Sequence, residues 1–408
     1  MKKLNIFETF AGIGSQHKAL ENLKNKSIID DYEILGISEW YISAIIAYTL
    51  IHYNDEFYKK LKELEVIFNI NEKKIKDFIL NELKLDVFST NSKDPSNLKR
   101  LKLETLKQLY VSMKISKNYG SVVSLKSEKM PKNIDVLTYS FPCQDLSNAG
   151  LKKGLEVGTR SGLIWEIGRI VKGLKEQDRP NVLLMENVPT LFNRFKDGWD
   201  IWKDELDKIG YDTYQTKLIS SNFNIPQMRV RAFAISVKRN GNINKEYLKN
   251  FNLDKEISKT KTYINAQMDI KLNGRKNLKS ILDKNIDFKY YIDKPFEVLK
   301  STDGKTGVKF DLIDHSTYEI ANRIYYTDYM SPTLTTGGFI KIYENEDDKI
   351  IRHIKEVEAF RLMGFKTEDY NKVEKYFTKG HLYKFAGNSI VVDVLESLFE
   401  VIDNIIEK

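Results

Sequence analysis

The chain holds a single cysteine, Cys143, and its setting is that of a candidate nucleophile. Cys143 follows an apolar run, 134–141, that predicts a buried strand, and it precedes a polar, glycine-containing loop, 145–162. Open α/β sheets bind their ligands at the carboxyl ends of strands. A thiolate placed there could attack a substrate. The alternative for a lone cysteine is a small buried hydrophobe without a chemical role.

Two further sets of side chains could act with this thiol. Glu186 ends a second apolar run, 182–185, so its carboxyl group falls at another strand end and could donate or share a proton. Arg229 and Arg231 precede a strand predicted at 232–237, and their alternation sends the two side chains to opposite sides. One of them could stabilise negative charge while the other locks the loop. The alternative is a pair of surface arginines beside a strand.

The N-terminal residues predict a nucleotide-binding unit that would position these groups. Residues 4–10 indicate a strand, 11–15 a glycine turn and 16–25 a helix, an order that lets backbone and helix N–H groups approach a ligand. A second strand, 32–38, ends at Glu39, where an acid can bind ribose hydroxyls. Trp40 beside it could pack on a base. The alternative is an acidic helix cap followed by a core aromatic.

The rest of the chain predicts an α/β protein of two domains. We expect residues 1–237, completed by 383–408, to form the catalytic and cofactor-binding domain, with a helical insertion at 57–117. Residues 238–382 form the second domain. They are rich in lysine and asparagine between 238 and 343, show few periodic runs, and therefore predict irregular structure.

Composition limits the class of protein. A chain of 408 residues with 41% hydrophobic residues is large enough for a substantial core, and no apolar run in it is long enough to cross a bilayer. One cysteine excludes an internal disulfide and a cysteine-based zinc cluster, and it favours a reducing cytoplasm. The net charge of +8 modestly favours a polyanionic partner.

Taken in order, these features resemble the cytosine-C5 DNA methyltransferases over nearly the whole chain. Seven of the family's motifs have counterparts, which makes a chance match remote. They are Phe10–Gly14, Glu39-Trp40, Pro142-Cys143-Gln144, Glu186-Asn187-Val188, Gln227 with Arg229 and Arg231, Arg352 with Glu358, Arg361, Met363, Gly364 and Phe365, and Gly387-Asn388-Ser389. Residues 140–147 and Pro332–Thr335 are most similar to bacterial single-chain enzymes that methylate CG.

The resemblance implies a Rossmann-like S-adenosylmethionine-dependent methyltransferase domain and a smaller, irregular mixed target-recognition domain. It implies methyl transfer to carbon 5 of a flipped cytosine in double-stranded DNA, at a CG site, through an adduct between Cys143 and carbon 6, with S-adenosylhomocysteine as product. The catalytic residues would be Cys143, Glu186, Arg229 and Arg231. The cofactor residues would be Phe10, Gly12, Ile13, Gly14, Glu39, Trp40, Ser121, Val122, Pro142, Asn388 and Ser389. The DNA contacts would be Gln144, Ser147, Gln227 and Thr333.

Two departures and three alternatives stay open. The family often has an acid after the glycine of its third motif, but Ser121 follows Gly120 here, and the insertion is longer than in small members. The alternatives are a tRNA cytosine methyltransferase, a silent nucleotide- and DNA-binding protein, and a thiol hydrolase that pairs Cys143 with His315, His353 or His381. We expect a cytoplasmic, DNA-associated bacterial monomer without metal or membrane attachment, with a cognate restriction endonuclease as a possible companion.

Overall fold

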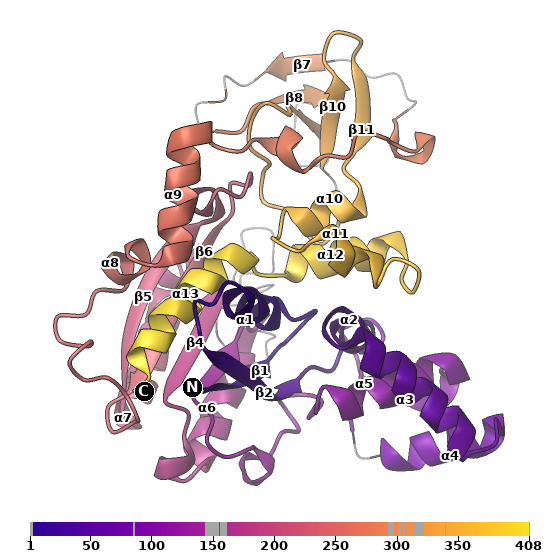
Figure 1. Ribbon diagram of the computed structural model, residues 1–408, viewed down its shortest axis with the longest axis vertical. Coiled ribbons are helices and arrows are strands. Elements are labelled where there is room, and N and C mark those ends of the chain that lie inside the picture. Colours follow the sequence, from indigo (N-terminus) through magenta and orange to yellow (C-terminus); the bar gives the residue numbers. More distant parts are fainter. Residues whose placement is uncertain are drawn as a thin grey trace. The chain divides into compact units, whose positions relative to one another are not determined.

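A computed structural model describes residues 3–84, 86–142, 155, 161–292, 298–301, 304, 307–313, 322–338 and 340–407 (Figure 1). The chain forms two compact units. Unit 1 comprises Met1–Lys217, Arg231–Ile257 and Leu398–Lys408, and unit 2 comprises Leu218–Val230 and Ser258–Ser397. These boundaries differ from the predicted ranges: 218–230 and 383–397 belong to unit 2, and 238–257 belong to unit 1.

The central sheet contains six strands in the described residues, in the order β2-β1-β3-β4-β6-β5. Strand β1 pairs in parallel with β2 and β3, β3 pairs in parallel with β4, and β6 runs antiparallel to β4. Because parallel strands end at one edge, the residues that follow β1, β2, β3 and β4 gather there, and β6 starts there. The α/β prediction is confirmed. The strands are β1 (Lys3–Thr9), β2 (Asp31–Ser38), β3 (Val136–Tyr139), β4 (Val182–Asn187), β5 (Tyr211–Ile219) and β6 (Val230–Lys238).

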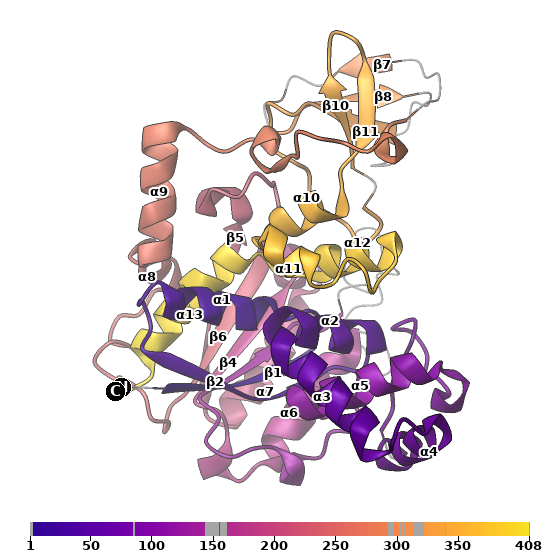
Figure 2. The same cartoon turned by 45° about the vertical axis from the view of Figure 1, so that its right-hand side comes forward.

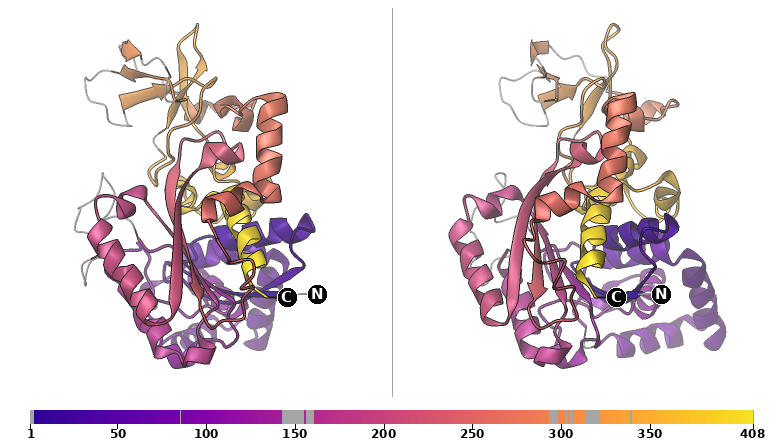
Figure 3. Two further views of the ribbon diagram at one scale, coloured as in Figure 1. Left: turned by 90° about the vertical axis from the view of Figure 1, so that its left-hand side faces the viewer. Right: turned by 60° about the vertical axis from the view of Figure 1, so that its left-hand side comes forward.

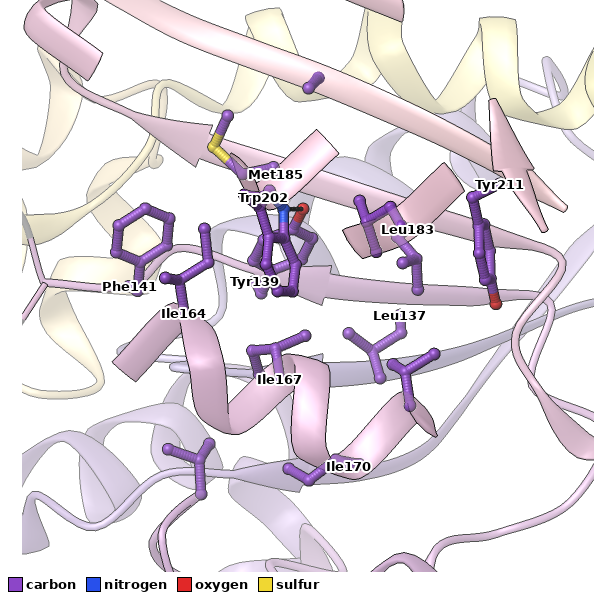
Figure 4. Packing of buried hydrophobic residues seen from close by; sticks show 14 of the residues in the cluster. Leu137, Tyr139, Phe141, Ile164, Ile167, Ile170, Leu183, Met185, Trp202 and Tyr211 are labelled. Carbon is purple, nitrogen blue, oxygen red and sulfur yellow. Dashed lines mark hydrogen bonds between the residues drawn. The ribbon is translucent and has the colours of Figure 1, made fainter. Parts of the chain in front are cut away.

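Helices cover both faces of this sheet (Figure 3). Helix α1 (Ser15–Asn25) lies on one face, and α6 (Ile164–Gly173) and α7 (Lys196–Lys208) lie on the other. The apolar stripe of α6 packs on β3 and β4, so that Ile167 lies among Leu137 and Leu183 (Figure 4). Within this core, Trp202 Nε1 donates to the Tyr139 hydroxyl at 3.1 Å, which pairs the polar atoms of two buried aromatic side chains. This core fixes the strand ends that carry the candidate site.

The insertion predicted at 57–117 is helical, as its spacing indicates (Figure 2). Its helices pack on one another through buried residues such as Phe57, Ile79 and Leu109. Helix α2 (Ile42–His52) precedes the insertion, and the helices within it are α3 (Asn54–Ile67), α4 (Glu72–Glu82) and α5 (Leu103–Ile115). Short 3-10 helices connect many elements of the chain: η1 (Leu98–Arg100), η2 (Ser127–Lys129), η3 (Ser161–Leu163), η4 (Glu176–Asp178), η5 (Pro189–Phe192), η6 (Ser220–Phe223), η7 (Leu278–Ile281) and η8 (Phe288–Tyr290).

Unit 2 is more regular than the sequence predicts. The composition of 238–343 predicts irregular structure, but the described residues there form a long helix and most of a sheet that has five strands in the described ranges, in the order β11-β10-β9-β8-β7. Strands of three to five residues are too short to show an alternating pattern. Helix α8 (Leu253–Ser258) lies almost entirely in unit 1. The elements of unit 2 in this part of the chain are α9 (Lys261–Asn273), β7 (Val298–Ser301), β8 (Phe310–Ile313), β9 (Arg323–Tyr325), β10 (Lys341–Asn345) and β11 (Ile350–His353).

Four helices complete the chain. Before them, Arg352 is fully buried and forms a bidentate pair with Glu358, at 2.8 and 2.9 Å, which fastens β11 to the first of these helices. No helix in the described ranges is long and apolar enough to cross a membrane. The helices are α10 (Glu356–Arg361), α11 (Thr367–Asn371), α12 (Lys379–Asn388) and α13 (Val392–Ile405).

One carboxyl group lies deep in unit 1. Glu8 on β1 is fully buried, and neither carboxyl oxygen has a hydrogen-bond partner of normal geometry within the described part of the chain. Burial raises the pKa of Glu8 to about 8, and the nearby Tyr48 hydroxyl and His17 backbone only partly oppose the shift. Glu8 therefore holds a proton at neutral pH.

We expect Glu8→Gln to flatten the pH dependence of stability. Between the ordinary pKa of 4.5 and the raised value of about 8, folded Glu8 keeps a proton that the unfolded chain has released. Its stabilising contribution is full below the lower value and is lost as pH rises, by about 1.4 kcal/mol per pH unit within the window. Glutamine lacks this titration. Denaturant unfolding at several pH values between 4.5 and about 8 should therefore show the stability of the variant rising relative to that of the wild type as pH increases. Equal pH dependence of the free energy of unfolding in the two proteins would contradict a buried, protonated Glu8.

Candidate active site

The glycine turn after β1 has a strained backbone. Phe10 has a φ of 54° and Gly14 a φ of 82°, both in the left-handed region. A non-glycine residue there costs about 1–3 kcal/mol, and such strain gathers at ligand sites. A Cβ atom added to Gly12 would meet nothing within 4 Å, so open space lies over the turn. The turn therefore fits a ligand that approaches the backbone closely.

Glu39, predicted to bind ribose, also holds this turn in place. Its carboxylate accepts hydrogen bonds from the backbone N–H groups of Gly12 at 3.0 Å and of Trp40 and Tyr41 at 2.8 Å each. The end of β2 and the glycine turn are thereby joined through one side chain. A carboxylate accepts about four hydrogen bonds, so this bracing does not by itself preclude the ribose contact, which stays a prediction.

A second turn, holding Ser121 and Val122, lies beside the first. Asn118 Oδ1 accepts hydrogen bonds from the N–H of Glu39 at 3.2 Å and of Gly120 at 2.8 Å, which ties this turn to the end of β2. Residues 120–123 form a turn and no strand. Gly120 has a φ of 71° and, like Gly12, faces open space. The predicted cofactor residues of unit 1 thus border one region.

Arg169 was missed by sequence reasoning, although it braces this second turn. Its guanidinium donates to the carbonyls of Val122 at 3.0 Å and Leu125 at 2.9 Å, and its Nε donates to Glu166 at 2.7 Å. In the sequence Arg169 is an arginine on the polar side of an amphipathic helix, a pattern that usually marks a solvated face. Only the packing of α6 against the 122–125 backbone reveals the role.

The segment that leads to the candidate nucleophile is anchored on both sides of Pro142. Asn187 Nδ2 donates to the Phe141 carbonyl at 3.0 Å, which joins the end of β4 to the backbone just before the thiol. The Ser161 hydroxyl donates to the Pro142 carbonyl at 2.9 Å. Cys143, Gln144 and Ser147 lie outside the described residues, so their predicted roles stay predictions.

Glu186 and Arg231 form an ion pair at the same sheet edge. Glu186 stands opposite Phe233 in the antiparallel register of β4 and β6, and Arg231 lies two residues from Phe233, on the same face. Arg231 Nε lies 3.2 Å from Glu186 Oε1, and the side chains are only 17% and 12% exposed, respectively. The sheet register thus brings a carboxyl group and a guanidinium together one strand away from the Phe141–Pro142 segment.

Arg229 lies in unit 2 and points to backbone. It donates to the carbonyls of Leu334 at 3.0 Å, Ser389 at 3.0 Å and Gly387 at 3.3 Å, and its side chain is buried. These contacts favour the locking role over the catalytic one for this arginine. Ser389 is buried, whereas Asn388 is exposed at the end of α12. Their cofactor contacts stay predictions.

Gln227 and Thr333, predicted to contact DNA, bind backbone within unit 2. The Gln227 amide is fully buried, accepting from Leu334 N–H at 2.8 Å and donating to the Leu362 carbonyl at 2.9 Å. The Thr333 hydroxyl donates to the Met228 carbonyl at 2.9 Å. The Thr333 hydroxyl can still accept a hydrogen bond, and the DNA contacts of both residues stay predictions. In this structure both residues support the loop that carries them.

Comparisons with known proteins point to one family. The family model described as C-5 cytosine-specific DNA methylase matches residues 97–404. The chain is 35% identical to the orphan methyltransferase M.SssI of Spiroplasma monobiae (strain ATCC 33825 / MQ-1), over 98% of this chain and 97% of that protein. It is 30% identical to the type II methyltransferase M2.ScrFI of Lactococcus lactis subsp. cremoris, over 97% and 98%.

Solved structures agree on the fold. The crystal structure of the S. pombe Dnmt2 methyltransferase is similar with a TM-score of 0.61, covering 98% of both chains at 18% identity. An E. coli structure of a putative DNA modification methyltransferase encoded within a prophage is similar with a TM-score of 0.53 at 16% identity, again covering 98% of both chains. At such identities the likeness shows the fold alone.

Proposed function

The chain belongs to the family of C-5 cytosine-specific DNA methylases, and from that premise we propose how its own residues carry out the reaction. The target is cytosine in double-stranded DNA, and the methyl donor is S-adenosylmethionine, on which the family generally depends. Because carbon 5 of a stacked cytosine is out of reach, the base is flipped out of the duplex. The protein acts as a monomer on DNA in the cytoplasm.

The nucleophile is the Cys143 thiolate. Carbon 5 of cytosine is a weak nucleophile, but bond formation between sulfur and carbon 6 makes carbon 5 part of an enamine. Carbon 5 would then take the methyl group of the donor, and S-adenosylhomocysteine would leave. The proton on carbon 5 then leaves to a base, the electrons of that bond reform the ring double bond, and the Cys143 sulfur departs as thiolate. Phe141 and Pro142, held by Asn187 and Ser161, fix the backbone from which the thiol projects.

The main structural support for this mechanism is the ion pair between Glu186 and Arg231. Addition of sulfur puts negative charge into the ring, and a carboxyl group at N3 and N4 with a guanidinium at O2 would stabilise it. The pair is mostly withdrawn from water, where such electrostatic interactions gain strength. Its guanidinium also orients the carboxyl group, so the two residues act as one unit.

The cofactor would lie over the glycine turn. The open space at Gly12 and Gly120, with Glu39 between their turns, suits a nucleoside that needs close backbone approach. S-adenosylmethionine, when bound, supplies an activated methyl group. Ser121 replaces the acid that the family often uses near adenine, so the Val122 backbone, braced by Arg169, would take over that contact.

We expect the purified protein with S-adenosylmethionine to methylate duplex DNA at CG, a target that rests on the resemblance at residues 140–147 and 332–335. Bisulfite sequencing of treated DNA locates the products, and methylated cytosines outside CG would overturn the site. The same assay on tRNA tests the alternative substrate. DNA binding should weaken by about 10³-fold or more between 50 and 200 mM salt, because phosphate contacts release counterions. A flat salt response would argue against duplex DNA.

A further inference from the structure

A buried cluster lies against the glycine turn on the side of α1 and α2, and none of its members has a part in the proposed chemistry. The cluster consists of Glu8 on β1, His17 on α1, and Tyr48 and His52 on α2. The imidazole rings of His17 and His52 are stacked, with centroids 4.1 Å apart and planes 9° apart. His17 Nδ1 is hydrogen-bonded to the Tyr48 hydroxyl at 2.9 Å. The three rings thus form one packed unit.

His52 connects this cluster to the backbone of the turn. Its Nε2 lies 3.1 Å from the Ile13 carbonyl oxygen. A carbonyl only accepts hydrogen bonds, so Nε2 must carry the hydrogen. The next residue, Gly14, presses directly on the cluster: a Cβ atom there would lie 2.3 Å from His52 Nε2 and 2.7 Å from the Tyr48 ring. The turn therefore rests on these two side chains without room for a methyl group.

We propose that His52, held by His17 and Tyr48, is a positioning residue that fixes the glycine turn in its strained shape and so sets the affinity for S-adenosylmethionine. The inference rests on the proposed function, because it assumes that this turn holds the cofactor. His52 does not touch the reacting atoms. It acts through the Ile13 carbonyl, and its loss allows the left-handed turn that starts at Phe10 to relax.

The close stacking of the His17 and His52 rings favours neutral side chains in this cluster. Burial lowers the pKa of His17 well below its usual range, and burial raises the pKa of Glu8 to about 8, so both groups are neutral near pH 7. A proton added to either ring would set positive charge against its stacked neighbour. Outside the cluster, the ionisable groups near the two rings are Lys18 on α1, which is paired with Glu21, Tyr32 on β2 and Tyr53 after α2.

The test compares His52→Ala, His52→Gln and the control His381→Ala, which removes an imidazole whose hydrogen bond to Thr378 is exposed on α12 of unit 2. Calorimetry gives the Kd for S-adenosylmethionine, and steady-state assays give kcat and both KM values. We expect His52→Ala to raise the cofactor Kd and KM about tenfold, the loss typical of one buried hydrogen bond. Its kcat and its KM for DNA should stay within about twofold. The glutamine amide can donate to the same carbonyl, so His52→Gln should recover most of the affinity.

The pH profile separates positioning from general damage to the fold. Because burial lowers the pKa of His17, wild-type cofactor affinity should stay constant through pH 6.5, the ordinary pKa of histidine, and should fall only at more acidic pH, when His17 acquires charge against its stacked neighbour. In His52→Gln that charge no longer meets a second ring, so this variant should lose most of the fall. The inference would be overturned if His52→Ala bound the cofactor with wild-type affinity at every pH. It would also be overturned if the KM for DNA rose as much as the KM for the cofactor. If His52→Ala does not fold, the pH dependence of cofactor affinity in His52→Gln serves as the test. A decrease of affinity at acidic pH equal to that of the wild type would contradict the proposal. A wild-type protein that binds the cofactor but methylates no DNA would instead refute the proposed function.

Discussion

Replacing Cys143 by alanine should reduce methyl transfer by about four orders of magnitude or more, the largest effect expected of any single substitution. Without sulfur at carbon 6, carbon 5 cannot become an enamine and the cytosine ring stays unreactive. Transfer of label from S-adenosylmethionine to duplex DNA measures the effect. Because the chain has one cysteine, alkylation of the wild type should inactivate it to the same extent.

Binding controls separate chemistry from recognition in this variant. Cys143→Ala should bind duplex DNA and S-adenosylmethionine with nearly wild-type affinity, because the anchors Asn187 and Ser161 hold the neighbouring backbone and not the thiol. Cys143→Ser keeps the size of the side chain but lacks a nucleophile that ionises near neutral pH, so it should be as inactive. Turnover by either variant near the wild-type rate would remove the nucleophile assignment.

Glu186→Gln and Arg231→Ala should each lower kcat by about 10²–10³-fold, since each removes stabilisation of charge that develops in the ring. The two groups are in contact at 3.2 Å, so the double variant should lose less than the product of the single losses. Single-turnover rates for the four proteins of this cycle give the coupling directly.

Arg239→Ala is the matched control for Arg231. Arg239 follows the opposite end of β6 and also pairs with carboxylates, Asp207 and Asp212, but it is well exposed and far from the edge that carries Glu186. Its removal should leave kcat unchanged, because exposed ion pairs contribute little. If the kcat losses of Glu186→Gln and Arg231→Ala multiply fully when the two substitutions are combined, the two residues act independently. That result would contradict their action as one unit.

Much of the architecture and the nature of the site were predictable because they depend on local patterns. The apolar runs at 134–141 and 182–185 lead into Pro142 and Glu186, and this pattern alone places these two residues at strand ends, as the end of the 32–38 run places Glu39. The order of the motifs then indicates the family, and the match over residues 97–404 confirms it.

What could not be predicted depends on contacts between residues distant in the chain. Arg169 meets the 122–125 backbone across more than forty positions, and the Asn187 bond to Phe141 spans a similar separation. The sequence predicts Glu39 as a ligand contact, yet its carboxylate also holds the backbone of the glycine turn. Side-chain hydrogen bonds to distant backbone leave no periodic pattern in a sequence, because the partner is any carbonyl or N–H group.

The covalent bond between Cys143 and carbon 6 of cytosine can be trapped in a duplex that carries a modified base. In duplex DNA with 5-fluorocytosine at the target position, methyl transfer leaves fluorine where a proton would depart, so the adduct cannot resolve. Mass spectrometry of the digested complex should find the modified nucleotide on the peptide that contains Cys143, and only with S-adenosylmethionine present. A nucleotide attached to any other residue, or no adduct from a preparation that methylates ordinary DNA, would contradict the covalent mechanism.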